Sequence, residues 1–246
     1  MIPIQDIVPR KTFPVVTVSL IILNTLIFIL MVNLPVSVRE ALVINFGVVP
    51  ARITQFGFGE AGKAFQNVIS LFTAMFLHGG WIHLLGNMWT LWIFGDNVED
   101  RMGHKRFLIF YLLCGVAATL IHVWLHPDST IPMIGASGAI SGVLGAYYGL
   151  FPLARVIVMV PIFFFPFFFE IPAVLYIGWW YLLQLFSGTL SILHGKIVGG
   201  VAWWAHIGGF LVGLFLHRLF CVGKKCFRDE VRPWGVSYNL GEKFNR

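Results

Sequence analysis

The sequence predicts an all-α membrane protein built from six helices. Of its 246 residues, 58% are hydrophobic and only 11% are charged, and the mean hydropathy is +0.82. A water-soluble domain carries roughly 25% charged residues, so lipid rather than water must solvate most of this surface. Apolar stretches long enough to cross a bilayer, which takes roughly 20 helical residues, recur along the chain and leave little room for a separate soluble domain.

Four segments are long and apolar enough to be spanning helices. They are residues 13–32, 106–125, 163–186 and 199–220. The first is too long for the core of a signal peptide and no Ala-x-Ala-like site follows it, so we expect a retained span. Two further segments, residues 81–95 and 135–150, are apolar but short and rich in glycine. Such helices are expected inside the bundle, where longer neighbours shield them from lipid.

A long first loop of mixed polarity, residues 35–66, follows the first span, and its residues 41–49 are expected in the membrane interface. A short apolar piece, residues 66–76, then leads into the second helix. The predicted organisation is a cytoplasmic N-terminal segment (1–12), a six-helix membrane domain (13–221) and a basic cytoplasmic tail (222–246) that rests on anionic lipid.

Basic residues predict the orientation. With a cytoplasmic N-terminus, the inside segments hold thirteen of the 17 Lys and Arg residues and the outside loops hold four. The positive-inside rule then puts both termini in the cytoplasm. The net charge of +6 is spread over these short stretches, so no nucleic-acid partner is predicted. Because no transit-like segment precedes the first span, we expect a prokaryotic cytoplasmic membrane.

The cysteines do not predict a disulfide framework or a metal site. Cys114 lies in an apolar run, and we expect Cys221 and Cys226 to be reduced. The Cys-x4-Cys pair has no companion His or Cys cluster, and no His-Glu-x-x-His motif occurs. No metal and no cofactor are therefore predicted.

Polar groups are costly in a bilayer, so each one needs a reason. The first set is Gly135-Ala136-Ser137-Gly138, at the start of the short fourth helix. Glycine allows a tight turn and the close approach of another backbone, and the free N–H groups of a helix N-terminus suit an oxyanion. Ser137 is a candidate nucleophile, and helix packing through small residues is the structural alternative.

The second set is centred on His206 in the sixth helix. Gly209 and Gly213 follow it by three and seven residues, so they share its face. A glycine face lets this helix press against the small-residue face of the fourth helix, which is needed if an imidazole is to reach a serine hydroxyl at roughly 2.6–3.2 Å. A purely structural histidine is the alternative.

The third set lies at the start of the second helix. His83 and Asn87 are four residues apart on one helical face, and both can donate hydrogen bonds to an oxyanion. Bonding only to neighbouring helices is the alternative. His78 precedes them and is expected to brace the adjoining loop.

These motifs together resemble the rhomboid family of intramembrane serine proteases, over about residues 66–218. The resemblance rests on three patterns in the family's order, which are His83-x-x-x-Asn87, Gly135-x-Ser137-Gly138 and Ala205-His206-x-x-Gly209-x-x-x-Gly213. It implies a six-helix rhomboid-like bundle with its active site below the outer membrane surface. It also implies that Ser137 attacks the peptide bond, that His206 takes its proton, and that the Ser137 N–H, His83 and Asn87 bind the oxyanion.

Two positions depart from the family pattern. Some members carry a tyrosine four residues after the serine that stacks on the histidine, whereas this chain has Ser141, so another group must hold the ring. The Trp-Arg motif of the first loop in some members is also missing. Glu170 is expected on the fifth helix near its cytoplasmic end, whereas Ser137 begins its helix from the outer side. A Ser-His dyad is therefore predicted rather than a triad.

The predicted activity is cleavage of transmembrane protein substrates at helix-destabilising, small-residue sites. The fifth helix and its phenylalanine-rich start, residues 163–169, are expected to face lipid and to flank the route by which a substrate helix enters. One alternative is a catalytically inactive member of the same fold that binds membrane helices. Another is a transporter or channel that uses His83, Asn87 and Glu170 as a polar pathway, although no internal repeat supports it. The sequence does not predict an oligomeric state.

Overall fold

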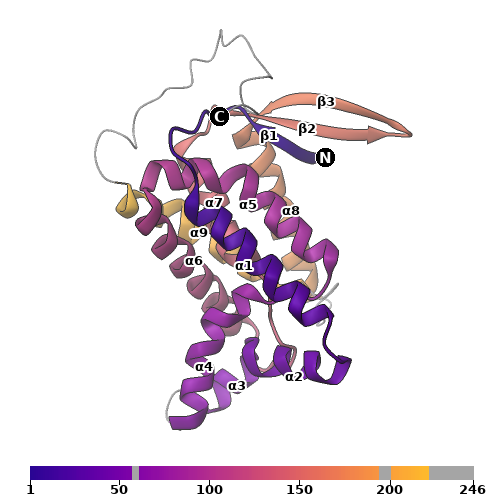
Figure 1. The fold of residues 1–246 in the computed structure, drawn as a ribbon, viewed down its shortest axis with the longest axis vertical. Helices are drawn as coiled ribbons and strands as arrows, with labels where there is room; N and C mark the ends of the chain where they lie inside the picture. Colours follow the sequence, from indigo (N-terminus) through magenta and orange to yellow (C-terminus); the bar gives the residue numbers. More distant parts are fainter. Residues whose placement is uncertain (57–60, 194–200, 222–246) are drawn as a thin grey trace.

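A computed structural model describes residues 1–56, 61–193 and 201–221, so the basic tail 222–246, with Cys226, lies outside the described residues. The described chain is mostly helical and carries one small sheet (Figure 1). Its elements in order are β1 (Ile2–Asp6), α1 (Val15–Val32), α2 (Val36–Phe46), α3 (Pro50–Phe56), α4 (Ala61–Thr73), a single 3-10 turn η1 (Ala74–Phe76), α5 (Trp81–Met102), α6 (His104–Leu125), α7 (Ser137–Leu150), β2 (Arg155–Ile162), β3 (Phe165–Pro172), α8 (Ala173–Leu193) and α9 (Trp203–Phe220).

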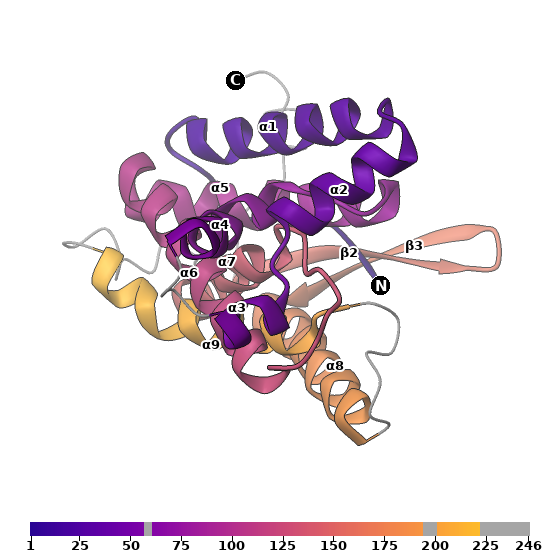
Figure 2. The same cartoon turned by 90° about the horizontal axis from the view of Figure 1, so that it is seen from below.

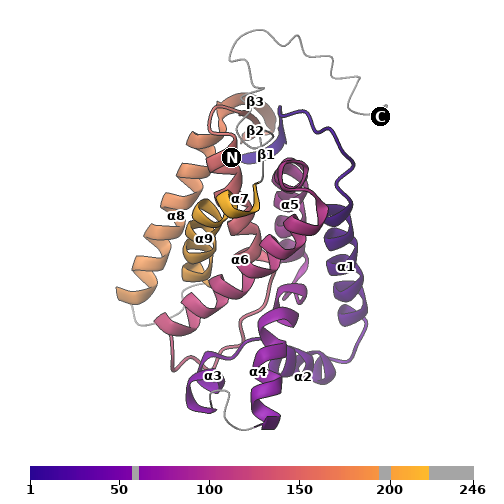
Figure 3. The same cartoon turned by 90° about the vertical axis from the view of Figure 1, so that its left-hand side faces the viewer.

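Helix α7 is the centre of the bundle. It packs against α5, α6 and α9 (Figure 2). All of its residues from Ala139 to Tyr147 are buried. Its many small residues allow that burial, because they let neighbouring helices approach closely. Helices α1 and α8 lie on opposite sides of the bundle (Figure 3). Most residues in the apolar stretch of each helix are not buried by the rest of the molecule. Exposed apolar helices of this kind are stable only where lipid covers them.

Three helices are long and apolar enough to cross a membrane, namely Val15–Val32, His104–Leu125 and Ala173–Ser191 among the described residues. The pair Ala64–Phe76 and Trp81–Met102 passes the same test but is bent by 81°, and it makes a fourth crossing if it forms one broken span. The six crossings expected from the sequence stay a prediction.

The second predicted helix is longer than expected. Its end was expected at Gly95, but α5 continues to Met102 and stops at Gly103, whose φ is +81°. The expectation was wrong because the acidic residues beyond Gly95 find partners at the start of α1. The buried Glu99 carboxylate accepts hydrogen bonds from the N–H groups of Val16 and Thr17 at 2.9 and 2.8 Å. The first N–H groups of a helix lack acceptors within the helix, so Glu99 caps α1 from the neighbouring helix.

The predicted fifth span is only partly helical. Residues 155–172 form a β-hairpin and α8 begins at Ala173, so the expectation of one helix over 163–186 was wrong. Prolines at positions 161, 166 and 172 are incompatible with a helix interior. Strand β2 pairs antiparallel with both β1 and β3, which gives the sheet order β1-β2-β3. The hairpin projects sideways from the end of the bundle that holds the N-terminus (Figure 1).

The predicted first loop contains helices that hold the segment before α7. Residues 35–66 include α2, α3 and the start of α4. The backbones of Val48 and Met133 bond to each other at 3.0 and 2.7 Å, and the Ala51 N–H donates to the Ser129 carbonyl at 2.9 Å. The first loop therefore fixes the path of residues 129–133, four residues before α7 begins.

The two cysteines that the structure describes differ in oxidation state. Cys114 is free and buried in the bundle core. Cys221 is disulfide-bonded, so the expectation of a reduced thiol at this position was wrong.

Candidate active site

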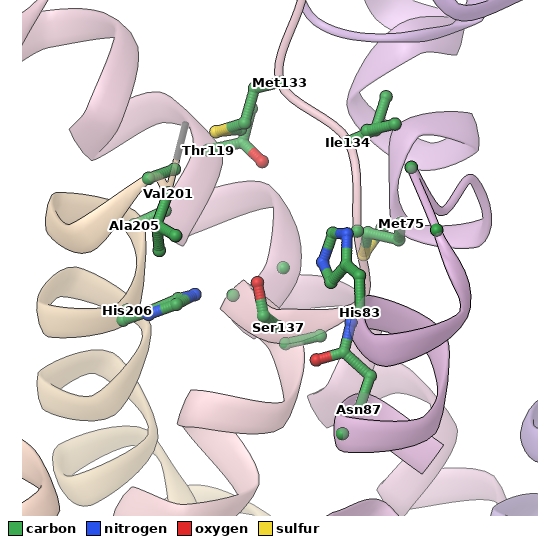
Figure 4. Close-up of a pocket in the computed structure, with 18 of the residues that line it drawn as sticks. Met75, His83, Asn87, Thr119, Met133, Ile134, Ser137, Val201, Ala205 and His206 are labelled. Carbon is green, nitrogen blue, oxygen red and sulfur yellow. The ribbon is translucent and has the colours of Figure 1, made fainter. Parts of the chain in front are cut away.

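A cavity of about 940 Å³ lies among α5, α6, α7, α9 and the loops that precede them. It is lined by six of the residues singled out from the sequence, which are His83, Asn87, Gly135, Ser137, Gly138 and His206. In Figure 4 the loop residues Met133, Ile134 and Val201 lie at one end of this cavity, and Ser137, His206 and Asn87 lie at the other. Motifs far apart in the sequence therefore meet in one space.

Ser137 is the first residue of α7, as the sequence indicates, and its side chain is partly exposed to the cavity. The preceding turn depends on Gly135, which has φ +123° and donates its N–H to the Ala74 carbonyl at 2.8 Å. A Cβ atom at this position would lie 2.6 Å from His83 Nε2. Only glycine satisfies both the positive φ and this close approach.

Glycines bring α9 against α7 at backbone contact. A Cβ atom on Gly209 would collide with the carbonyl oxygen of Gly138, and one on Gly213 would collide with that of Gly142. The next turn of α7 also contacts the backbone of α9, because a Cβ atom on Gly145 would collide with the carbonyl oxygen of Phe210. This contact puts His206 on the wall facing Ser137, and the imidazole points toward the serine hydroxyl (Figure 4).

The His206 ring is held from α8 and by flanking indoles. Its Nδ1 lies 2.9 Å from Oε1 of Gln184. The rings of Trp180 and Trp203 have centroids 6.1 Å from that of His206, inclined at 31° and 86°. Ser141 takes no part, because it is buried and its hydroxyl donates to the Ser137 carbonyl at 2.7 Å.

The opposite wall carries the predicted oxyanion donors. The side chains of His83 and Asn87 reach the cavity from α5, on the other side of Ser137 from His206 (Figure 4). Asn87 Nδ2 lies 3.0 Å from Nε2 of the buried His78, whose ring also meets the ring of His83 edge-on at 5.1 Å. His78 thus contacts both donors rather than only the loop. The roles of these residues stay predictions.

Sequence reasoning missed the groups around the imidazole. The sequence did not connect Gln184, Trp180 or Trp203 with His206. The sequence did contain a signal for Gln184. A polar side chain in the middle of an apolar span is costly in lipid and therefore indicates a hydrogen-bond partner on a neighbouring helix. Glu170 lies elsewhere, on strand β3 beside Arg155 at 3.8 Å, so its predicted place within a helix was wrong.

Comparison with known proteins identifies the family. The family model described as "Rhomboid domain" matches residues 66–223. Rhomboid protein 1, mitochondrial, from Saccharomyces cerevisiae is 29% identical over 156 residues, which are 59% of this chain and 40% of that protein. Rhomboid-like protein 11, chloroplastic, from Arabidopsis thaliana is 32% identical over 151 residues, 58% of this chain and 49% of that protein.

A bacterial relative shares a shorter region. Rhomboid protease GluP from Bacillus subtilis is 42% identical over 76 residues, which are 31% of this chain and 14% of that protein. The matches span less than half the length of each of these three relatives. Since the family model covers well over half of this sequence and the matching region contains the whole cavity, the chain belongs to the rhomboid family.

Proposed function

We propose that this protein is an intramembrane serine endopeptidase that hydrolyses peptide bonds in or near the transmembrane segments of membrane proteins. The observation that carries the proposal is the shared cavity, in which a serine at a helix start lies between an imidazole and a pair of side-chain donors (Figure 4). A nucleophile, a base and oxyanion donors on separate elements are the parts that acyl transfer requires.

In the proposed reaction, Ser137 Oγ attacks the scissile carbonyl carbon while His206 Nε2 accepts the hydroxyl proton. The carbonyl oxygen becomes an oxyanion, and the Ser137 N–H, His83 and Asn87 stabilise it as donors. His206 then gives its proton to the departing amine, which leaves an acyl ester on Ser137. Water, deprotonated by His206, hydrolyses that ester and restores both side chains.

The short length of α7 supports a route by which water would reach a peptide bond within the lipid slab. Helix α7 has 14 residues. At 1.5 Å per residue it is about 21 Å long, shorter than the hydrocarbon core of about 30 Å. We expect Ser137, at its start, to lie below the outer membrane surface, with the loop residues Met133, Ile134 and Val201 at the outer end of the cavity (Figure 4). Irregular backbone at this depth is tolerated where it lines a water-filled cavity.

A substitution series tests the proposal with purified protein and a panel of single-span substrates. Ser137→Ala should abolish cleavage, and His206→Ala should come close, because the two groups act as a unit. Asn87→Ala should lower turnover by about 10²–10³-fold, the loss of one oxyanion donor. Thr90→Val, one turn further along α5, is the matched control and should keep wild-type activity.

The same series separates the competing functions. Wild-type cleavage that persists in Ser137→Ala would refute the proposal, and so would failure of a fluorophosphonate probe to label Ser137. An intact protein that binds substrate helices but cuts none would instead be the inactive helix-binding member of the family. Serine-independent solute flux in liposomes would favour a transporter.

A further inference from the structure

Gln184 makes the one hydrogen bond that the structure records for the His206 ring within the described residues. It lies near the middle of α8, on the face turned toward α9, and its side chain is buried. Its Oε1 lies 2.9 Å from His206 Nδ1. Its Nε2 donates to the carbonyl of Trp180, one turn earlier in the same helix, at 3.1 Å.

The second contact decides which end of the amide faces the histidine. Because the NH₂ group is bonded to the Trp180 carbonyl, the carbonyl end of the amide is turned toward Nδ1. An amide oxygen can only accept a hydrogen bond, so Nδ1 must carry the proton of a neutral imidazole. Nε2 is then free of hydrogen, and its lone pair is available to Ser137.

An uncharged acceptor suits this location. A carboxylate in the same place would have to lose its hydration inside the bundle, at a cost that its attraction to an imidazolium often fails to repay. An amide carbonyl fixes the same proton at lower cost, and it still stabilises the imidazolium that forms during attack. The indole of Trp180, on the same helix, limits rotation of the ring from one side.

We propose that Gln184 is a positioning residue that holds His206 in the Nδ1–H tautomer, in place of the aromatic ring that Ser141 cannot supply. The inference rests on the proposed function, since the tautomer matters only if His206 is the base. Gln184 does not contact the reacting atoms. It acts through the imidazole, as the partner of the second ring nitrogen does in histidine-based sites generally.

Two substitutions of nearly equal size test the role. Gln184→Met keeps the volume but removes the acceptor, and it should lower kcat by roughly 10- to 100-fold with little change in KM, the usual loss for a residue that orients a histidine. Gln184→Glu keeps an acceptor for Nδ1–H but loses the donor to Trp180, and it should retain kcat within a few-fold. Thr189→Val, a solvent- or lipid-facing change further along α8, is the matched control.

A spectroscopic measurement reads the tautomer directly and does not depend on proteolysis. In Ser137→Ala protein with ¹⁵N-labelled histidine, the His206 signals are assigned by their loss in a protein that also carries His206→Ala. We expect a protonated Nδ1 and a bare Nε2. Adding Gln184→Met should mix the two tautomers, whereas adding Gln184→Glu should not.

The outcomes are distinguishable from failure of the proposed function. If wild-type protein shows no serine-dependent cleavage, the protease proposal fails, and the ¹⁵N spectra still decide the contact. Wild-type kcat in Gln184→Met with an unchanged Nδ1–H signal would overturn the inference. So would equal loss of kcat in Gln184→Met and Gln184→Glu, because packing rather than the acceptor would then explain the effect.

Discussion

Single glycines set the separation between the serine and the histidine. At Gly213 the atoms that a Cβ would meet all belong to the backbone of Gly142, so no side chain can move aside to make room. The two helices would have to separate, and His206 would move away from Ser137 with them.

Gly213→Ala should therefore destabilise the protein by about 1–3 kcal/mol, the usual cost of overpacking. It should also slow labelling of Ser137 by a fluorophosphonate. Gly178→Ala is the control, because its Cβ would meet only Tyr148 at an ordinary 3.9 Å. Thermal unfolding and probe labelling measure the two effects, and an unchanged Tm with unchanged labelling in Gly213→Ala would contradict the argument.

Single residues could be predicted where a short stretch of sequence indicates their role, and not where the role depends on a contact between distant segments. Ser137, His83 and Asn87 were found because a helix start and an i, i+4 spacing are visible in a short stretch of sequence. The partner of His206 was not found, because Gln184 is 22 residues away and the contact exists only once α8 packs on α9. Likewise, nothing near His78 in the sequence indicates that it bonds to Asn87.

Among the elements, the long or glycine-rich apolar helices were predicted better than the β-hairpin. The start of α7 and the presence of α1, α6 and α9 follow from length and apolar composition. The hairpin was missed because an unbroken apolar run does not distinguish a strand from a helix. Its prolines and alternating Val156 and Val158, both buried, were the usable signal.

The hairpin tip is the most exposed apolar surface near the sheet. Phe163 and Phe164 are 93% and 97% exposed, and residues 156–169 carry no charge. Pro161 and Pro166 face each other across the hairpin and lack N–H groups, which lowers the cost of leaving water. We expect the tip to lie in the lipid interface beside the exposed side of α8.

An environment-sensitive fluorophore tests the position of the tip. Phe164→Cys labelled with NBD in liposomes should show blue-shifted emission that nitroxide-bearing acyl chains quench. Asp128→Cys, in an exposed loop at the other end of the bundle, should show neither effect. Water-like emission from position 164 would place the tip outside the lipid.

Helix α8 is the element expected beside the substrate's route of access, because so much of its surface is uncovered by the bundle. Replacing the exposed Leu175 and Trp179 by alanine should change kcat/KM for a single-span substrate and leave fluorophosphonate labelling unchanged. The matched change on α1, Leu26 and Leu30 to alanine, should affect neither. Equal loss of substrate cleavage and labelling in the α8 variant would count against this route.

At the scale of the whole molecule, the sheet ties together two parts of the chain that must share one side of the membrane. Strand β1 at the N-terminus pairs with β2, which follows α7. The excess of Lys and Arg on that side predicts that it is cytoplasmic. The prokaryotic cytoplasmic membrane expected from the sequence stays a prediction, and two of the relatives described above are named as mitochondrial and chloroplastic.

Reporter fusions test this orientation. A reporter active only in the cytoplasm should function at the N-terminus and when inserted between Phe163 and Phe164. It should fail when inserted after Asp128. Opposite results at the N-terminus and at position 163 would be incompatible with the sheet, and activity at all three sites would refute the predicted crossings.

The pairing of β1 with β2 also determines when the sheet can form during synthesis of the chain. Ile2 lies opposite Met159, so the first strand leaves the ribosome about 150 residues before its partner. At roughly 5–20 residues per second, the start of the chain waits about 8–30 s while several helices enter the bilayer. During that interval β1 has no strand to pair with. The sheet therefore forms late in biogenesis, after the early spans have inserted, and it cannot direct their insertion.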